Sequence, residues 1–173
     1  MRRAAAIFGG AEPQLFEWSG ENSPRVRLAA ATELAGKLRG QSSIHLLGFS
    51  HGGNVAAKVA SLLPPGAVET LVTIATPVLR GRYRPAAALN HIHLYSDRDL
   101  MQRGGGEWFR LPQIGSIGLA RRSYPEASGV RNIRIEGVAT TGLGGRHGDI
   151  LWWDETWLRL EEALRLPAGN IPG

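Results

Sequence analysis

The stretch IHLLGFSHGGNV, residues 44–55, decides the fold. Its first half is an apolar run typical of a buried strand, and the pattern Gly-x-Ser-x-Gly, from Gly48 to Gly52, stands where this strand meets a helical pattern. A serine on such a turn is held in a strained backbone conformation, and glycines two residues before and after it prevent side chains from colliding. The stretch therefore predicts a nucleophile elbow that lifts the Ser50 hydroxyl above a sheet. The backbone N–H of His51, at a helix N-terminus, is then aimed at a developing oxyanion.

Outward from this stretch, short apolar and β-branched runs alternate with helical patterns. The helical patterns cover residues 25–39, 51–63 and 155–166. The expected strands are residues 4–8, 15–18, 44–49, 70–75, 91–95 and, at a half-exposed edge, 130–138. Strands that alternate with helices pair in parallel and carry the helices on their faces. The sequence therefore predicts one α/β domain over residues 1–173, with a compact, mostly parallel, twisted sheet and helices on both faces.

Polar residues follow several of the expected strands. An open parallel sheet binds its ligand at the carboxyl ends of its strands. The residues that come just after strand or strand-like segments are Ser50, Thr76, Asp97, Asp99 and His147. We therefore expect these side chains to gather at one edge of the sheet.

A serine hydroxyl is a poor nucleophile until a base removes its proton, so a histidine is required elsewhere in the chain. In folds with this elbow the order along the chain is serine, acid, histidine. Of the five histidines, only His147 comes late enough, in a glycine-rich loop between the last strand and the last helix. His51 adjoins the serine and contributes its backbone, and the remaining histidines lie within expected strands: His45, His91 and His93. The order along the chain favours His147 as the base.

The acid that orients this base is left open between two aspartates. Asp97 and Asp99 both follow the expected strand 91–95, and at most one of them needs to be catalytic. The other is then a turn residue or a surface partner of Arg98. Asp149 is two residues from His147 and too close along the chain to curl back and hold its ring.

The composition excludes several other chemistries. The chain has no cysteine, which rules out disulfides, zinc–thiolate sites and a thiol nucleophile. No apolar run approaches the roughly 20 residues that span a bilayer, and the N-terminus lacks a convincing signal peptide, so we expect a cytoplasmic protein. The net charge is +5, and the basic residues are scattered along the chain. Its densest cluster, Arg80, Arg82 and Arg84, has no interleaved aromatic residues, so nucleic-acid binding is not expected.

A family resemblance covers most of the chain, from about residue 16 to 157. An arginine- and alanine-rich helical pattern carries it together with four segments: FEWSGEN (16–22), GFSHGGN (48–54), TIATP (73–77) and YSDRD (95–99). Together they resemble the lipase- and esterase-like α/β hydrolases, and the serine segment is the most specific of them. The resemblance implies a compact α/β-hydrolase-like fold and hydrolysis of a carboxylic ester, small or lipid-like, through an acyl-enzyme, with no metal and no cofactor. In this family the acid lies a few residues past a strand end and just before a hydrophobic residue, which fits Asp99 better than Asp97.

The resemblance also implies a second oxyanion donor in an early loop, commonly a His-Gly pair that follows a strand. The segment Phe8-Gly9-Gly10 is similar to that loop, so Gly9 or, as the alternative, Gly10 is the expected donor. Too few residues separate this loop from Leu15 for the helix of a parallel crossover. The first two expected strands therefore either form a hairpin or have lost the usual helix between them.

Three functional hypotheses follow. Ester hydrolysis uses Ser50 as nucleophile, His147 as base, Asp99 to hold the ring of that base and the N–H of His51 at the oxyanion. The alternative is a binding protein built on a catalytically decayed hydrolase fold, because the N-terminal part is compressed. A third hypothesis is peripheral contact with anionic membrane surfaces through the arginines. Residues 102–129, rich in glycine, proline, arginine and serine, are expected to form part of a lid or substrate wall.

Overall fold

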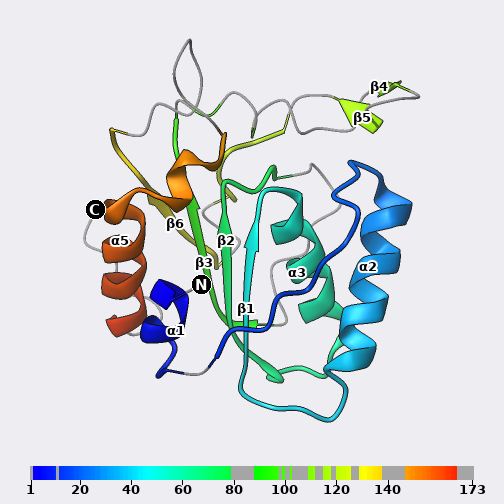
Figure 1. Cartoon of the computed structure of the whole chain (residues 1–173), viewed down its shortest axis with the longest axis horizontal. Coiled ribbons are helices and arrows are strands. Elements are labelled where there is room, and N and C mark those ends of the chain that lie inside the picture. Colours follow the sequence, from blue (N-terminus) through cyan, green and yellow to red (C-terminus); the bar gives the residue numbers. More distant parts are fainter. Residues whose placement is uncertain are drawn as a thin grey trace.

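A computed structural model shows a four-stranded parallel sheet with helices on both of its faces (Figure 1). It describes residues 2–10, 12–78, 88–97, 99, 102, 109–111, 115–117, 120–125, 129–137 and 147–166. In chain order the elements are α1 (Arg2–Ile7), α2 (Pro24–Lys37), β1 (Ile44–Phe49), α3 (His51–Leu62), β2 (Val68–Ile74), β3 (Ala88–Tyr95), β4 (Phe109–Leu111), β5 (Gly115–Ile117), β6 (Arg131–Arg134), the 3-10 helix η2 (His147–Leu151) and α5 (Asp154–Arg165). The α/β class and the parallel sheet predicted from the sequence are confirmed.

The sheet has the order β1-β2-β3-β6, and each neighbouring pair of strands is parallel. Phe49 pairs with Ile74, and Ile74 pairs with Leu94, so the first three strands end at the same level. Because all four strands run the same way, their carboxyl ends form one edge of the sheet. The segments that carry the candidate site residues leave the sheet at this edge.

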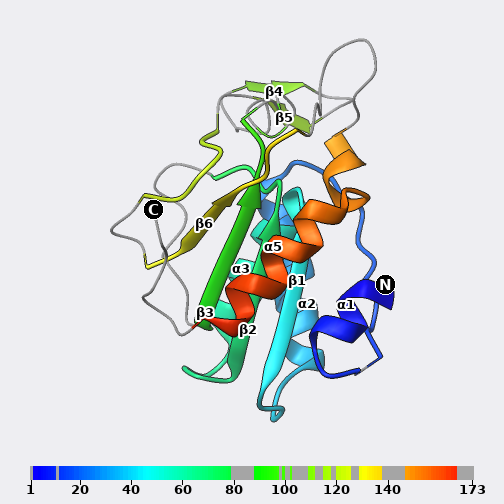
Figure 2. The same ribbon diagram turned by 90° about the vertical axis from the view of Figure 1, so that its left-hand side faces the viewer.

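Each face of the sheet has its own apolar core (Figure 2). On one face lie α2 and α3, where small residues such as Ala31 and Ala60 are fully buried and let the two helices pack closely. The other face is covered by α1, η2 and α5, and its core includes Ile150 of η2 and Leu160 of α5. The burial of Ile150 fixes η2, and with it His147, against the sheet.

The two expected strands nearest the N-terminus are wrong. Residues 4–8 belong to α1 and the turn after it, because arginine and alanine, which make up all but the last residue of α1, are strong helix formers. Residues 15–18 form no regular element and pair with no strand in the described part of the chain. The N-terminal hairpin considered from the sequence is therefore also absent from the described residues.

The other expected elements are confirmed with small shifts of their ends. β1 has the expected bounds, and α2, α3 and α5 end within two residues of the expected helices. The last strand, β6, is shorter than residues 130–138, and it lies at the edge of the sheet as expected. Within residues 102–129, β4 and β5 form an antiparallel pair. The remainder of that expected lid lies largely outside the described residues.

Two observations bear on the expected partners. Within the ranges that the structure describes, no helix has both the length and the apolar character needed to cross a membrane. The arginine cluster at residues 80–84 lies outside the described residues. The two expectations, no binding of nucleic acid and peripheral contact with a membrane surface, therefore stay predictions.

Two buried histidines of β3 are joined through a threonine of β2. His91 Nε2 lies 3.0 Å from Thr73 Oγ1, and His93 Nδ1 lies 2.8 Å from the same oxygen. His93 Nε2 donates to the backbone carbonyl of Arg122 at 2.7 Å, so the proton of this ring is on Nε2. Burial lowers the pKa of His91 to about 3 and that of His93 to about 4. Both rings are therefore neutral at pH 7.

The free energy of unfolding is expected to fall in mild acid because of these rings. In the unfolded chain they titrate near pH 6.5 and in the folded chain only near pH 3 to 4, so unfolding takes up protons in between. Their stabilisation is complete above pH 6.5 and is lost toward pH 4, at about 1.4 kcal/mol per pH unit for each histidine. His91→Gln keeps an N–H toward Thr73 and is expected to remove one histidine's share. Urea unfolding of the wild type and of His91→Gln at pH 7, 6 and 5 measures how steeply the free energy of unfolding of each falls with pH. Equal slopes for the two proteins would contradict the expectation.

Candidate functional site

Ser50 stands at the turn between β1 and α3 in a strained backbone conformation. Its φ is 51° and its ψ is −132°, outside the regions that L-residues favour. Such a conformation costs about 1–3 kcal/mol and persists only where the surrounding structure enforces it. The Ser50 N–H donates to the carbonyl of Ile74 at 2.9 Å, and the Ser50 carbonyl accepts from the Gly53 N–H at 3.0 Å. The residue is half-buried, so the core does not seal it from solvent.

Two glycines allow close packing at this turn, Gly48 against the start of α3 and Gly53 against Thr76, which follows β2. A Cβ on Gly48 would lie 2.5 Å from Gly53 Cα, and a Cβ on Gly53 would lie 1.9 Å from Thr76 Oγ1. Both distances are far below van der Waals contact. A Cβ on Gly52 would meet only Trp18 Nε1, at 4.0 Å. The crowding expected two residues before the serine is therefore present, but its counterpart after the serine is at Gly53 and not, as expected, at Gly52.

The structure brings Asp99 and His147 together at the carboxyl edge of the sheet. His147 Nδ1 donates to Asp99 Oδ2, with 2.7 Å between the two atoms. Asp99 follows β3 and is fully buried, whereas the His147 side chain, at the start of η2, is 19% exposed. Because the proton of the neutral ring is on Nδ1, the lone pair is on Nε2. An imidazole held in this tautomer can accept a proton from a hydroxyl group.

Asp97, the alternative acid, points elsewhere. Its Oδ2 lies 3.1 Å from Nη1 of Arg134 in an ion pair at the surface, and its side chain is 54% exposed. Of the two aspartates that the sequence left open, the structure thus brings Asp99 to His147 and keeps Asp97 away from it. This arrangement agrees with the preference for Asp99 that the family resemblance gave.

The ring of His147 lies against the residue that precedes Ser50. The centroids of the Phe49 and His147 rings are 4.9 Å apart. In the described part of the chain, no hydrogen bond joins the Ser50 hydroxyl to His147. Such bonds are often long in a site without substrate and tighten when substrate binds. The catalytic roles of Ser50, Asp99 and His147 stay predictions.

His51 is the residue that follows Ser50 in the chain. It is the first residue of α3, so its backbone N–H is one of those that lack a partner within the helix. Burial, with smaller effects of the charges of Arg27 and His147, lowers the pKa of the His51 ring from 6.5 to about 4. The ring is therefore neutral at pH 7, and it is close enough to His147 for the two rings to influence each other.

Gly9, the expected second oxyanion donor, lies at the opposite end of β1. The ring of Phe8 stacks on His45, with centroids 4.8 Å apart, and His45 is the second residue of β1. Five further residues along a strand span roughly 16 Å before Ser50 is reached. Figures 1 and 2 also show α1 near the amino ends of the strands. A donor must lie about 3 Å from the oxyanion, and the structure does not bring Gly9 to Ser50: Gly9 lies in the turn after the helix α1, where a strand leading to the site was expected.

Two residues that the sequence analysis did not single out, Gln102 and Arg122, hold the Asp99 loop in place. Gln102 donates its backbone N–H to Asp99 Oδ1 at 2.8 Å and its side-chain Nε2 to the Arg122 carbonyl at 2.8 Å. Arg122 Nε in turn donates to the backbone carbonyl of Asp99 at 3.1 Å. These three bonds form a closed circuit around the acid. The spacing Asp-x-x-Gln, in which a carboxylate accepts the N–H three residues on, is the one signal that the sequence offered.

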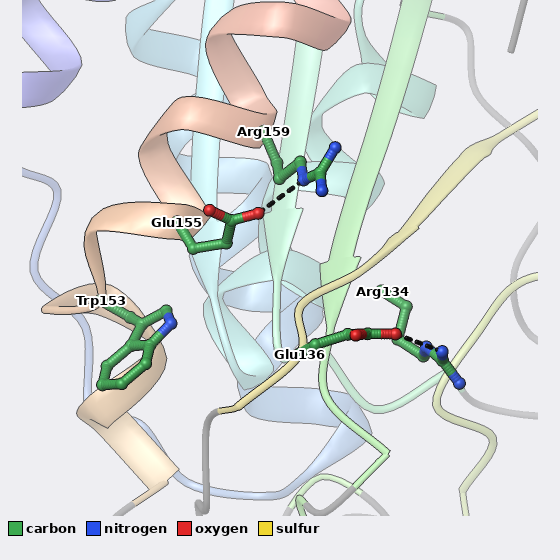
Figure 3. Close-up of a pocket in the computed structure, with 5 residues that line it drawn as sticks. All are labelled: Arg134, Glu136, Trp153, Glu155 and Arg159. Carbon is green, nitrogen blue, oxygen red and sulfur yellow. Dashed lines mark hydrogen bonds and ion pairs between the residues drawn. The ribbon is translucent and has the colours of Figure 1, made fainter. Parts of the chain in front are cut away.

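Two hollows among the described residues lie near the carboxyl edge of the sheet, and neither of these two is lined by Ser50 or His147. The first, of about 310 Å³, lies between β6 and α5 (Figure 3). Arg134 pairs with Glu136 there, and Arg159 pairs with Glu155 at 2.7 Å, so the charges that line it neutralise each other. The second, of about 470 Å³, lies beside the end of β3 and includes Arg122 of the Asp99 circuit.

Comparison with models of protein families, with curated proteins and with solved structures finds no match for this chain. The geometry around Ser50 is therefore the basis on which a function can be inferred. That geometry combines a strained serine, a buried carboxylate and an imidazole at one edge of a parallel sheet.

Proposed function

We propose that the protein is a serine hydrolase of the α/β-hydrolase type that cleaves carboxylic esters through an acyl-enzyme. One observation carries the proposal: a fully buried Asp99 orients His147 through a 2.7 Å hydrogen bond at the sheet edge where Ser50 is held in a strained conformation. A carboxylate, an imidazole and a serine in this chain order are the components of an activated nucleophile. The packing of Phe49 on His147 adds support, because it brings the ring next to the serine turn.

In the proposed reaction Ser50 Oγ attacks the carbonyl carbon of the ester while His147 Nε2 takes the hydroxyl proton. Asp99 holds the ring and stabilises its positive charge. The backbone N–H of His51, at the positive end of α3, donates to the oxyanion that forms. Collapse of this intermediate breaks the ester bond, and His147 gives its proton to the departing alcohol. Water then attacks the acyl-enzyme by the same route in reverse and releases the acid.

The direct test is turnover of a short-chain nitrophenyl ester. The wild-type protein is expected to release nitrophenol well above the background of Ser50→Ala, measured at equal protein concentration. Circular dichroism of both proteins confirms that they are folded. Equal turnover by the two proteins would refute the proposal.

Replacement of the two aspartates separates their roles. Asp99→Asn is expected to lower kcat by up to about 10⁴-fold, because an amide in place of the carboxylate favours the wrong tautomer of His147. Asp97→Asn removes only a surface pair with Arg134 and is expected to change kcat less than twofold. Steady-state kinetics on the same ester measure both. A larger loss for Asp97→Asn than for Asp99→Asn would exclude Asp99 as the acid.

A binding protein without catalysis is the second candidate, and one observation favours it. Gly9 lies far from Ser50, so in the described part of the chain the segment Phe8-Gly9-Gly10 does not supply the second oxyanion donor that an early loop supplies in the resembling family. Such a protein would bind an ester or acid without turnover. In the nitrophenyl ester assay it would show wild-type turnover equal to that of Ser50→Ala, so the same experiment decides between the two candidates.

A further inference from the structure

The side chain of His51 is held on one edge by two donors from α2 and α3. Arg27 Nη1 and Asn54 Nδ2 each lie 3.5 Å from His51 Nδ1. Arg27 is buried and is itself anchored, because its Nη1 donates to Asn22 Oδ1 at 2.7 Å. Asn54 is anchored by its own bond to the backbone carbonyl of Pro77, at 3.1 Å. The ring is therefore held at its Nδ1 edge, the edge that faces α2 and α3.

These contacts determine which ring nitrogen carries the proton. A guanidinium has no acceptor, so Arg27 can only donate to His51 Nδ1. The amide orientation of Asn54 is settled by Pro77, since a carbonyl oxygen accepts only from the NH₂ end of the amide. Both neighbours thus require Nδ1 to be an acceptor. In the neutral ring, which the lowered pKa of about 4 ensures at pH 7, the proton is then on Nε2.

The Nε2–H edge of His51 is free to meet another molecule. No residue in the described ranges accepts a hydrogen bond from it, and it is not among the buried polar atoms that lack a partner. The two ring nitrogens point in widely different directions, so a ring held at Nδ1 by α2 and α3 turns Nε2 away from these helices. His147 lies close enough to influence the ring. A neutral donor with a fixed tautomer thus stands beside Ser50.

We propose that the His51 imidazole binds an uncharged oxygen in the acyl part of the substrate through its Nε2–H. The proposal rests on the proposed function and adds the substrate class: esters whose acyl chain carries a second acceptor, such as an ether, hydroxyl or keto oxygen near the carbonyl. The acyl side is favoured because the backbone N–H of the same residue faces the carbonyl oxygen. The departing alcohol must instead face His147, which protonates it. A neutral donor supplies no charge to compensate a buried anion, and burying an uncompensated anion is costly, so an uncharged acceptor is expected.

A matched pair of esters tests this specificity. The nitrophenyl esters of butanoic and methoxyacetic acid have chains of equal length and differ only in one methylene group replaced by oxygen. Dividing each kcat/KM by the rate of hydroxide-catalysed hydrolysis removes the difference in their intrinsic reactivity. The corrected preference of the wild type for methoxyacetate is expected to fall about fivefold in His51→Ala. His51→Gln, whose amide N–H occupies a position similar to Nε2–H, is expected to keep at least half of the preference.

Each outcome bears on one of the two proposals. An unchanged preference in His51→Ala, with both esters still hydrolysed, would overturn the role of the His51 side chain and leave the hydrolase intact. Hydrolysis of neither ester by folded wild type would overturn the proposed function and this inference together. The ¹⁵N resonances of the His51 ring supply a readout without catalysis, since they distinguish the two neutral tautomers. A proton on Nδ1 would contradict the inference even in an active enzyme.

Discussion

Ser50→Ala and His147→Ala are each expected to lower kcat on a short-chain ester by about 10⁴-fold or more, and the double variant is expected to lose no more than either single one. The reason is that the two side chains act as one unit: a hydroxyl without its base is not a nucleophile, and a base without the hydroxyl has no proton to take. The contact between Phe49 and His147 and the bond from His147 to Asp99 are the structural basis for this coupling.

Ser61→Ala is the matched control for this comparison. Ser61 also lies in α3, but it is exposed, and its hydroxyl donates to the backbone carbonyl of Lys58. Its replacement is expected to leave kcat unchanged. The four variants are compared by steady-state kinetics after thermal unfolding has shown that each is folded. Losses of Ser50→Ala and His147→Ala that multiply in the double variant would mean that the two residues act independently.

Gly53→Ala is expected to destabilise the protein by about 3 kcal/mol. The added Cβ would lie 1.9 Å from Thr76 Oγ1 and 2.9 Å from Thr76 Cβ, and Thr76 is fully buried, so it cannot swing aside. The serine turn would have to move away from β2. Because the carbonyl of Ser50 accepts a bond from the Gly53 N–H, turnover is expected to fall together with stability.

Gly52→Ala provides the comparison at the preceding position of the same helix. Its Cβ meets only Trp18 Nε1 at 4.0 Å, an ordinary contact, and alanine is the better helix former by up to about 1 kcal/mol. We therefore expect the stability of this variant to be unchanged or slightly higher. Urea unfolding of both variants measures the difference. Similar midpoints for Gly52→Ala and Gly53→Ala would show that the turn does not pack against Thr76 as described.

Patterns of apolar residues that extend over many positions predicted the helices and strands well. The apolar run before Ser50 gave the bounds of β1, and the spacing of apolar residues gave the helices on both sides of it. The parallel order of the strands then followed from the alternation of strands and helices. It also followed that residues after different strands, such as Asp99 and Ser50, lie at one edge of the sheet.

The errors arose where a local pattern had to be decided by distant contacts. Residues 4–8 are apolar, as in a strand, but three of them are alanines, which favour a helix. In the structure the segment is helical up to Ile7, and Phe8 stacks on His45 of β1. For the same reason the structure does not bring Gly9 to Ser50. The crowding at Gly53 depends on Thr76, which lies just after β2 and which no pattern around Ser50 reveals.

The choice between the two aspartates is of the same kind. Asp97 and Asp99 are two residues apart and chemically identical, so the residues alone left both open, and only the family resemblance favoured one. In the structure Asp99 is buried beneath His147 and held by Gln102, while Asp97 pairs with Arg134 at the surface. The partners of His51 were missed for a similar reason, because Arg27 lies 24 residues away in another helix.

Labelling with a fluorophosphonate probe is the most direct measurement of whether Ser50 is an activated nucleophile. The probe bonds to a serine only when a neighbouring base removes the hydroxyl proton. The folded protein is expected to take up one probe, which peptide mapping by mass spectrometry locates at Ser50, and His147→Ala is expected to label much more slowly. A folded wild-type protein that takes up no probe, or that takes it up at another residue, would contradict the proposed chemistry of the site.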